Sequence, residues 1–194
     1  MPHLSYERRQ LTFKLVYTGP GMSGKTTNLV FLYRSLSGER KGELLTLDTA
    51  EERTLFFDFF PLEIGEIDGY SLHFNLYTVP GQVYYEASRR LILDGADGVV
   101  FVADSQPDRL DENLESFQRL EENLSSYGHD PRAFPRVLQY NKRDCESPLP
   151  RGCIETRLGL GSTLPVFDAV ATEGAGVVET IHALCRQVIE DFRL

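Results

Sequence analysis

The stretch Gly19-Pro20-Gly21-Met22-Ser23-Gly24-Lys25-Thr26 decides the fold, because it fits the pattern G-x-x-x-x-G-K-[ST] at every specified position. Gly19, Gly21 and Gly24 can adopt positive φ without a Cβ clash, so the main chain can wrap around a phosphate. Backbone N–H groups at the start of a helix hold phosphate oxygens with dipoles that are already oriented. A glycine-rich turn with a chance Lys-Thr pair is the alternative, and the flanking sequence has to decide between the two.

The flanking residues supply the strand, loop and helix order that a phosphate-binding loop needs. Residues 11–17 place an apolar side chain at every second position, and residues 29–36 carry apolar side chains at helical spacing. We therefore expect the Lys25 ammonium on the β- and γ-phosphate oxygens, the Thr26 hydroxyl on Mg²⁺ and the Thr27 amide near the α-phosphate. The other candidate phosphate contacts come from the loop backbone at Gly19, Gly21, Met22, Ser23 and Gly24.

Length and charge restrict the class of protein. The 194 residues are enough for a domain with its own core, so we expect a single domain over residues 1–194. The net charge is −9 and no basic run occurs, which argues against nucleic acid or an anionic membrane surface as a partner.

No segment of the sequence is typical of a targeting signal or an anchor. The first ten residues are polar and no long apolar run occurs, so we expect a cytoplasmic protein. Residue 2 is Pro, and the C-terminal residues 191–194 form no prenylation box, so no lipid anchor is expected. Cys145, Cys153 and Cys185 lack metal-ligand spacing and are expected to be reduced and structural.

Strands and helices alternate along most of the chain. The dipeptide Asp68-Gly69 is a strong hairpin signal, so one strand is expected to run antiparallel to the others. We expect six strands and about five helices, arranged as a doubly wound α/β domain with a mostly parallel sheet and ligands at the carboxyl ends of its strands. After the first strand, the expected strands are residues 59–67, 70–79, 98–104, 137–141 and 164–170, and long helices are expected at 109–127 and 177–192.

The tetrapeptide Asn141-Lys142-Arg143-Asp144 stands at the carboxyl end of an expected strand. The Asp144 carboxylate can accept two parallel hydrogen bonds from the ring N–H and the exocyclic amine of guanine, whereas adenine presents the wrong donors. Asn141 is expected to tie this loop to the phosphate loop, and the stem of Lys142 to cover the base. Alone the pattern is weak, but its position after a phosphate loop makes it a strong guanine signal.

A third motif, Thr78-Val79-Pro80-Gly81-Gln82, ends the second strand of the hairpin. The backbone N–H of Gly81 can approach a γ-phosphate without side-chain obstruction, and Gln82 can orient an attacking water molecule. An ordinary Pro-Gly turn is the alternative for this segment.

With these motifs in this order, the chain resembles the Ras-like small GTPases and, within them, the bacterial MglA family. The resemblance runs from about Leu11 to the final helix and includes residues 51–59 and Val170-Ala171-Thr172. It implies the P-loop small GTPase fold and a GTP/GDP switch that controls bacterial cell polarity and motility. It also implies GTPase activation by an MglB homodimer of Roadblock fold, a chain that is monomeric alone, and recruitment to a cell pole.

The resemblance also assigns roles between the phosphate loop and the hairpin. Thr54 is expected to sense the γ-phosphate, with its hydroxyl on Mg²⁺ and its amide on phosphate in the GTP form; Thr49 is an alternative. Arg53 is expected to act as an arginine finger in cis, as MglA proteins use an arginine here. A solvated arginine beside Glu51 and Glu52 is the other interpretation.

Two positions depart from the general small-GTPase pattern. Thr78 stands where a carboxylate normally holds a magnesium-bound water, and Asp58 is a candidate to replace it. The MglA pattern shares this threonine, so we interpret it as a family trait. The usual S-A-K motif is replaced by Val170-Ala171-Thr172, in which the Ala171 amide is expected to donate to the guanine oxygen.

Two other functions are kept as alternatives. A scaffold that binds GTP without hydrolysing it is suggested by Thr78, but Gln82 and Arg53 argue against it. An ATP-using P-loop kinase is suggested by the phosphate loop alone, but residues 141–144 argue against it.

Overall fold

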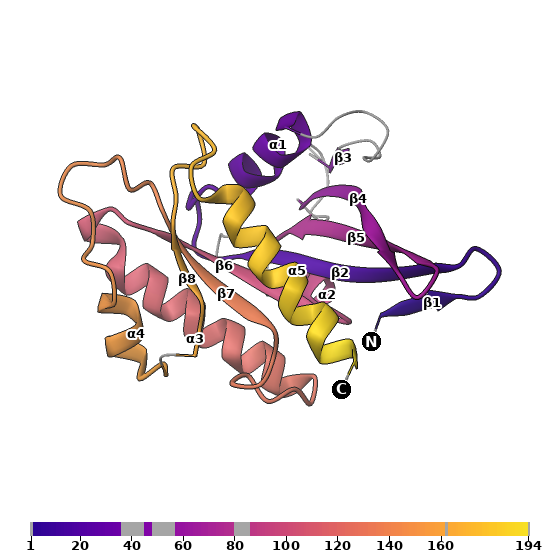
Figure 1. Ribbon diagram of the computed structural model, residues 1–194. Coiled ribbons are helices and arrows are strands. Elements are labelled where there is room, and N and C mark those ends of the chain that lie inside the picture. The colour runs from indigo at the N-terminus through magenta and orange to yellow at the C-terminus, as the bar shows by residue number, and fades with distance from the viewer. Residues whose placement is uncertain (1, 36–44, 48–56, 80–85, 162, 194) are drawn as a thin grey trace.

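The strand that leads into the phosphate loop, β2 (Gln10–Thr18), lies in the middle of a mixed sheet. The computed structural model describes residues 2–35, 45–47, 57–79, 86–161 and 163–193 (Figure 1). β2 pairs in parallel with β5 (Tyr70–Thr78) on one side and with β6 (Gly98–Asp104) on the other. The loop after β2 therefore leaves the sheet between two neighbouring strand ends.

The predicted mostly parallel sheet with an antiparallel hairpin strand is confirmed. The strand order is β3-β4-β5-β2-β6-β7-β8, and β1 pairs with β2. Asp68 and Gly69 have φ values of 51° and 79°, the positive pair that a tight two-residue turn between antiparallel strands requires. The remaining strands are β1 (His3–Ser5), β3 (Leu45–Leu47), β4 (Phe57–Ile67), β7 (Arg136–Asn141) and β8 (Val166–Asp168).

The number of strands differs from the six expected, because the described sheet has eight. The two additional strands, β1 and β3, have three residues each and pair antiparallel with β2 and β4. Three residues cannot display the alternation that identifies a strand in sequence. The last expected strand, 164–170, shortens to β8, since Pro165 cannot donate to a sheet partner.

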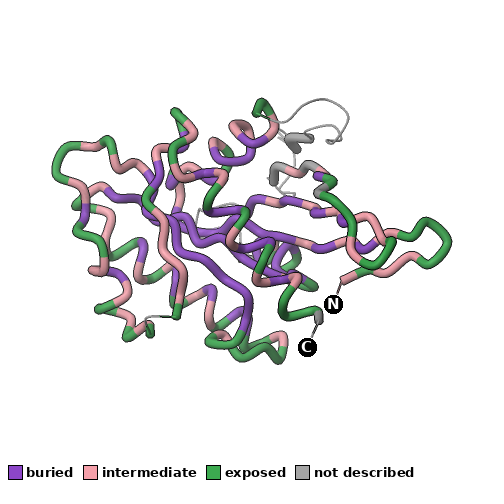
Figure 2. The backbone as a smooth tube through the Cα atoms, viewed as in Figure 1, coloured by how far each residue is buried: buried purple, intermediate pink, exposed green. Residues whose placement is uncertain are grey.

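Helices cover both faces of the sheet, as the doubly wound arrangement predicts. One core cluster joins the sheet to α1 and α5, and the other joins it to α2, α3 and α4. Every residue of β6 is buried, and the centre of the sheet forms the buried interior in Figure 2. The helices are α1 (Lys25–Ser35), α2 (Glu86–Leu93), α3 (Leu110–Ser126), α4 (Cys153–Leu158) and α5 (Val177–Arg193), and a 3-10 turn, η3 (Pro107–Arg109), precedes α3.

Two further expectations concern the chain as a whole. All three cysteines are free, as expected, and burial raises the pKa of the Cys185 thiol to about 12. None of the helices in the described ranges has the length and apolar character needed to cross a bilayer.

Candidate nucleotide-binding site

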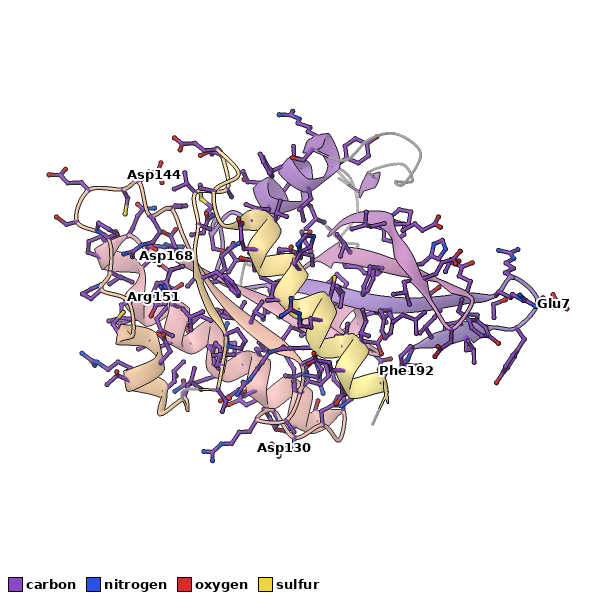
Figure 3. The ribbon with its side chains drawn as sticks, viewed as in Figure 1. Glu7, Asp130, Asp144, Arg151, Asp168 and Phe192 are labelled. Atoms are coloured by element: carbon purple, nitrogen blue, oxygen red, sulfur yellow. The ribbon has the colours of Figure 1, made fainter. Side chains whose placement is uncertain are left out.

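The predicted motifs converge at the carboxyl edge of the parallel strands. The phosphate loop follows β2, and the loop with residues 141–144 begins at the end of β7, whose Asn141 pairs with Asp104 of β6. Val170-Ala171-Thr172 follows β8 at the same edge. Asp144 lies at the outer end of its loop, away from the sheet (Figure 3). The edge therefore brings together three segments that lie far apart in sequence.

The phosphate loop has no room for side chains at two of its glycines. Gly19 has φ 137°, and a Cβ there would lie 2.2 Å from the Val102 carbonyl oxygen. Gly24 has φ 99°, and a Cβ there would lie 2.2 Å from Asn141 Nδ2. Met22 also has positive φ, 62°, although it is not a glycine; it is 86% exposed, so its Cβ can point into solvent.

Lys25 lies across its own loop. Its Nζ donates to the carbonyl oxygens of Gly19, at 3.1 Å, and Pro20, at 2.6 Å, and the residue is buried. These carbonyls hold the ammonium at the N-terminus of α1, where the helix dipole also favours an anion. Thr26 is exposed and Thr27 half-buried in the first turn of the same helix.

Asn141 connects all three segments. Its Nδ2 donates to the Ser23 carbonyl oxygen at 2.8 Å, which confirms the predicted tie to the phosphate loop. Its Oδ1 accepts the Ala171 amide at 2.9 Å, and Asn141 itself is 2% exposed. The Ala171 amide, expected to donate to guanine, is thus engaged with Asn141. The amide of the next residue, Thr172, which is exposed, donates to no described group.

The rest of the 141–144 loop is anchored except for its last carboxylate. Lys142 has φ 62°, and its Nζ donates to Asp104 Oδ2 at 2.6 Å. The Arg143 amide donates to the Ala169 carbonyl at 3.1 Å, and its Nη1 donates to the Leu149 carbonyl at 2.6 Å. Asp144 is exposed and makes no hydrogen bond or ion pair with the described part of the chain. Its two oxygens are therefore available as acceptors for a base.

Other predicted residues lie outside the described ranges. These are Thr49, Arg53, Thr54, Gly81 and Gln82, and the side chain of Asp58 is outside them too. Thr78 is described: it ends β5, pairs with Tyr17 of β2 and is 3% exposed.

The sequence was also compared with known proteins and protein families. No protein-family model matches the chain. The chain is 48% identical over 196 aligned residues to the Mutual gliding-motility protein MglA of Myxococcus xanthus (strain DK1622), and the alignment covers 100% of this chain and 98% of that protein. The chain belongs to the MglA family. The family assignment made from the order of the motifs is thereby confirmed.

A buried polar network supports the phosphate loop of this MglA-family chain, and the sequence reasoning missed it. Asn28 Nδ2 donates to the Gly24 carbonyl at 2.9 Å, and Gln139 Nε2 donates at 3.0 Å both to Asn28 Oδ1 and to Thr180 Oγ1. The Asn28, Gln139 and Thr180 side chains are fully buried. Buried polar groups with several partners fix a local geometry, because leaving one unpaired is costly. In the sequence, the only hint of this network was Gln139, a polar residue between Leu138 and Tyr140 in the buried strand β7.

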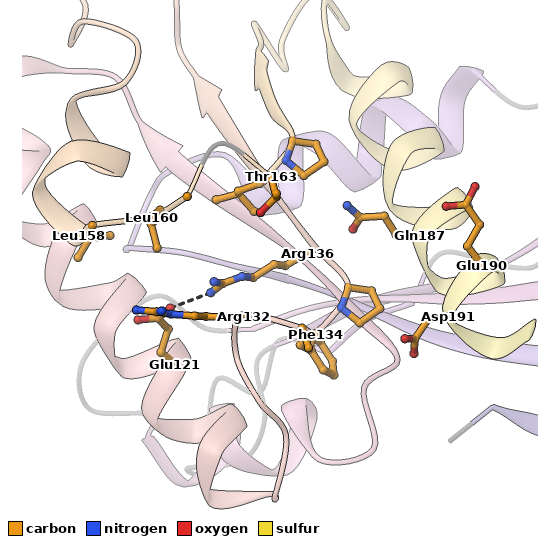
Figure 4. A pocket seen from close by; sticks show the side chains of 16 residues that line it. Glu121, Arg132, Phe134, Arg136, Leu158, Leu160, Thr163, Gln187, Glu190 and Asp191 are labelled. Carbon is orange, nitrogen blue, oxygen red and sulfur yellow. Dashed lines mark hydrogen bonds and ion pairs between the residues drawn. The ribbon is translucent and has the colours of Figure 1, made fainter. Parts of the chain in front are cut away.

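A second feature of the MglA-family chain lies apart from these residues. A pocket of about 500 Å³ opens between α3, α5 and the segments before β7 and β8, at the opposite edge of the sheet (Figure 4). Arg136 Nη1 donates to Glu121 Oε1 at 2.9 Å across its wall. None of the predicted nucleotide contacts lines this pocket.

Gly24→Ala is expected to remove nucleotide binding and to destabilise the fold by about 2 kcal/mol or more, because the new Cβ overlaps Asn141 and φ is unfavourable. Gly128→Ala is the matched control, since Gly128 also has positive φ, 83°, but nothing lies near its Cβ position. Thermal unfolding and binding of labelled GDP measure both effects. Normal GDP binding by Gly24→Ala would show that the loop does not need its close contact with Asn141.

Proposed function

We propose that this MglA-family protein is a GTP/GDP-dependent switch that hydrolyses GTP to GDP and phosphate, built as a single G domain over residues 1–194. The single observation that carries this proposal is the pair of hydrogen bonds by which Asn141 joins the phosphate loop to Ala171. This arrangement brings the glycine-rich loop and the segment with Asp144 to one edge of the sheet, which supports a proposed phosphate site beside a proposed carboxylate acceptor for guanine. The 48% identity to a gliding-motility protein supports control of cell polarity and motility through effectors that bind the GTP state.

The nucleotide is proposed to bind with its phosphates in the phosphate loop and its base against the loop with residues 141–144. The backbone of Gly19, Gly21, Met22, Ser23 and Gly24, with Lys25 and the Thr27 amide, takes the phosphates. Asp144 accepts the guanine ring N–H and amine, Lys142 covers the base, and the backbone of the segment that holds Ala171 and Thr172 is proposed to lie beside the guanine oxygen.

The residues present fit a Mg²⁺ ion that is held largely by the nucleotide. Thr26 is an exposed residue in the first turn of α1, next to Lys25. Thr26 and Thr54 are the proposed hydroxyl ligands, while Thr78 offers no charge to the ion. When bound, Mg²⁺ neutralises charge on the β- and γ-phosphates.

Hydrolysis is proposed to use positioning and electrostatics, with no covalent intermediate. Gln82 orients the attacking water, the Gly81 amide holds the γ-phosphate, and Arg53 stabilises the charge that develops during transfer. Intrinsic turnover is proposed to be slow and to be accelerated by an activating partner.

An MglB-like Roadblock-domain homodimer is the proposed activator. The chain alone is proposed to be a monomer in the cytoplasm that is recruited to a cell pole, with no nucleic-acid partner. Effector and exchange proteins are left open.

Phosphate release from GTP in a single turnover, with and without the MglB-like homodimer, tests the proposal. We expect slow release that the homodimer accelerates, and we expect GDP but not ADP to compete. Tight GTP binding without accelerated release would favour the scaffold, whereas equal competition by ADP would favour the kinase.

A further inference from the structure

A buried carboxylate lies between the phosphate loop and the guanine loop. Asp104 ends β6 and is 1% exposed. Its Oδ2 accepts Lys142 Nζ at 2.6 Å and lies 3.9 Å from Arg109 Nε, while its Oδ1 accepts the Gln106 amide at 3.1 Å. A buried carboxylate persists only where cations and donors surround it. Asp104 thus holds one cation from the guanine motif and a second, Arg109, that the motifs did not indicate.

Arg109 carries this connection to the phosphate loop. Its Nη2 donates to the Gly21 carbonyl oxygen at 2.9 Å, across 88 residues of sequence. Its Nη1 pairs with Glu112 on the first turn of α3, and its side chain is 24% exposed. The planar guanidinium therefore joins Gly21, Asp104 and Glu112 at once, which a lysine ammonium on a flexible stem cannot reproduce.

The contact fixes the orientation of one peptide unit in the loop. In a trans peptide the carbonyl and the following N–H point in opposite directions. Because the Gly21 carbonyl points to Arg109, the Met22 N–H of the same peptide points away from Arg109, and we expect it to face the phosphate oxygens. Met22 also has φ 62°, which is unfavourable for a side chain of this kind. The peptide therefore needs an external contact to stay in this orientation.

We propose that Arg109, held by Asp104, is a positioning residue that slows nucleotide dissociation by locking the Gly21–Met22 peptide. The inference rests on the proposed nucleotide site. The same carboxylate orients Lys142, so one buried group sets the geometry of both the phosphate loop and the guanine loop. Among the described residues, Arg109 forms no hydrogen bond or ion pair with residues 141–144, and it acts through the backbone of the phosphate loop.

Dissociation of fluorescently labelled GDP from the full chain, chased with excess GDP, measures this role. Arg109→Gln is expected to release GDP about 10-fold faster, the effect of losing one partly exposed charge-assisted hydrogen bond. Arg109→Lys is expected to release it at an intermediate rate. Arg119→Gln is the control, because Arg119 pairs with Glu115 on the exposed side of α3 and should leave the rate unchanged.

Two further measurements separate positioning from general stability. Asp104→Asn keeps the side-chain volume and is expected to release GDP at least as fast as Arg109→Gln, and the double variant no faster than Asp104→Asn alone, since both act on one connection. Arg109→Gln should leave the preference for GDP over IDP, which lacks the exocyclic amine, at the wild-type value.

The outcomes are distinct. A wild-type dissociation rate in Arg109→Gln, or an equal acceleration in Arg119→Gln, would overturn the inference while leaving the nucleotide site intact. Failure of the wild-type chain to retain GDP better than ADP would instead contradict the proposed function, and this inference with it.

Discussion

Asp144→Asn is expected to change the selected base from guanine to xanthine. An asparagine amide places an N–H donor against the exocyclic amine of guanine, also a donor, and the charge-assisted pair of hydrogen bonds is lost. Affinity for GDP should fall by about 100-fold or more. Xanthine carries a carbonyl oxygen in place of that amine, so it accepts from the new side chain and XDP should bind better than GDP. Competition of GDP and XDP against labelled nucleotide measures the change.

Glu146→Gln is the matched control for this substitution. Glu146 is exposed on the same loop, two residues later, and it carries the same charge. Its replacement should leave both affinities unchanged. If both variants lost GDP equally, the effect would come from the loop's charge, and Asp144 would have no direct contact with the base.

The central part of the fold was predictable because local patterns and tertiary structure agree there. β2, the phosphate loop and α1 each carry their own signal, and β6 is an apolar run of strand length. The hairpin turn at Asp68-Gly69 needs residues that tolerate positive φ, and the sequence supplies them. β1 and β3 were not predictable, since their three residues become strands only by pairing with a neighbour.

The contacts of the site could be predicted where they belong to a sequence motif. Contacts between residues outside the motifs could not be predicted, because they arise only when the chain folds. Asn141 belongs to a motif, and its bond to Ser23 follows the expectation. The hydrogen bond from the Ala171 amide to that same Asn141 could not be predicted from the tripeptide Val170-Ala171-Thr172 alone. Asp104 and Arg109 have no motif of their own, although Asp104 stands at the carboxyl end of a parallel strand, where ligand-binding groups gather in this fold.

Arg53→Ala is expected to lower activator-stimulated GTP hydrolysis by roughly 1000-fold, the lower end of the range for an arginine finger. The guanidinium is proposed to meet charge that develops only during phosphoryl transfer, so GTP affinity should stay near the wild-type value. Gln82→Ala should likewise lower the rate of hydrolysis and leave GTP affinity unchanged, because a water molecule that is not oriented slows the reaction without weakening binding. Single-turnover phosphate release with the MglB-like homodimer, beside equilibrium GTP binding, measures both quantities.

Conservative and remote variants decide whether Arg53 acts directly. Arg53→Lys keeps the charge but loses the planar donor pair, so it should recover only part of the rate. Arg34→Ala removes an exposed arginine from the last turn of α1 and should have no effect. Full activity in Arg53→Ala would support the alternative of a solvated arginine, and hydrolysis would then rest on Gln82 and the partner. A loss of GTP affinity equal to the loss of rate would instead place Arg53 in ground-state binding of GTP. Removing an interaction that forms only in the transition state cannot lower the affinity for the substrate.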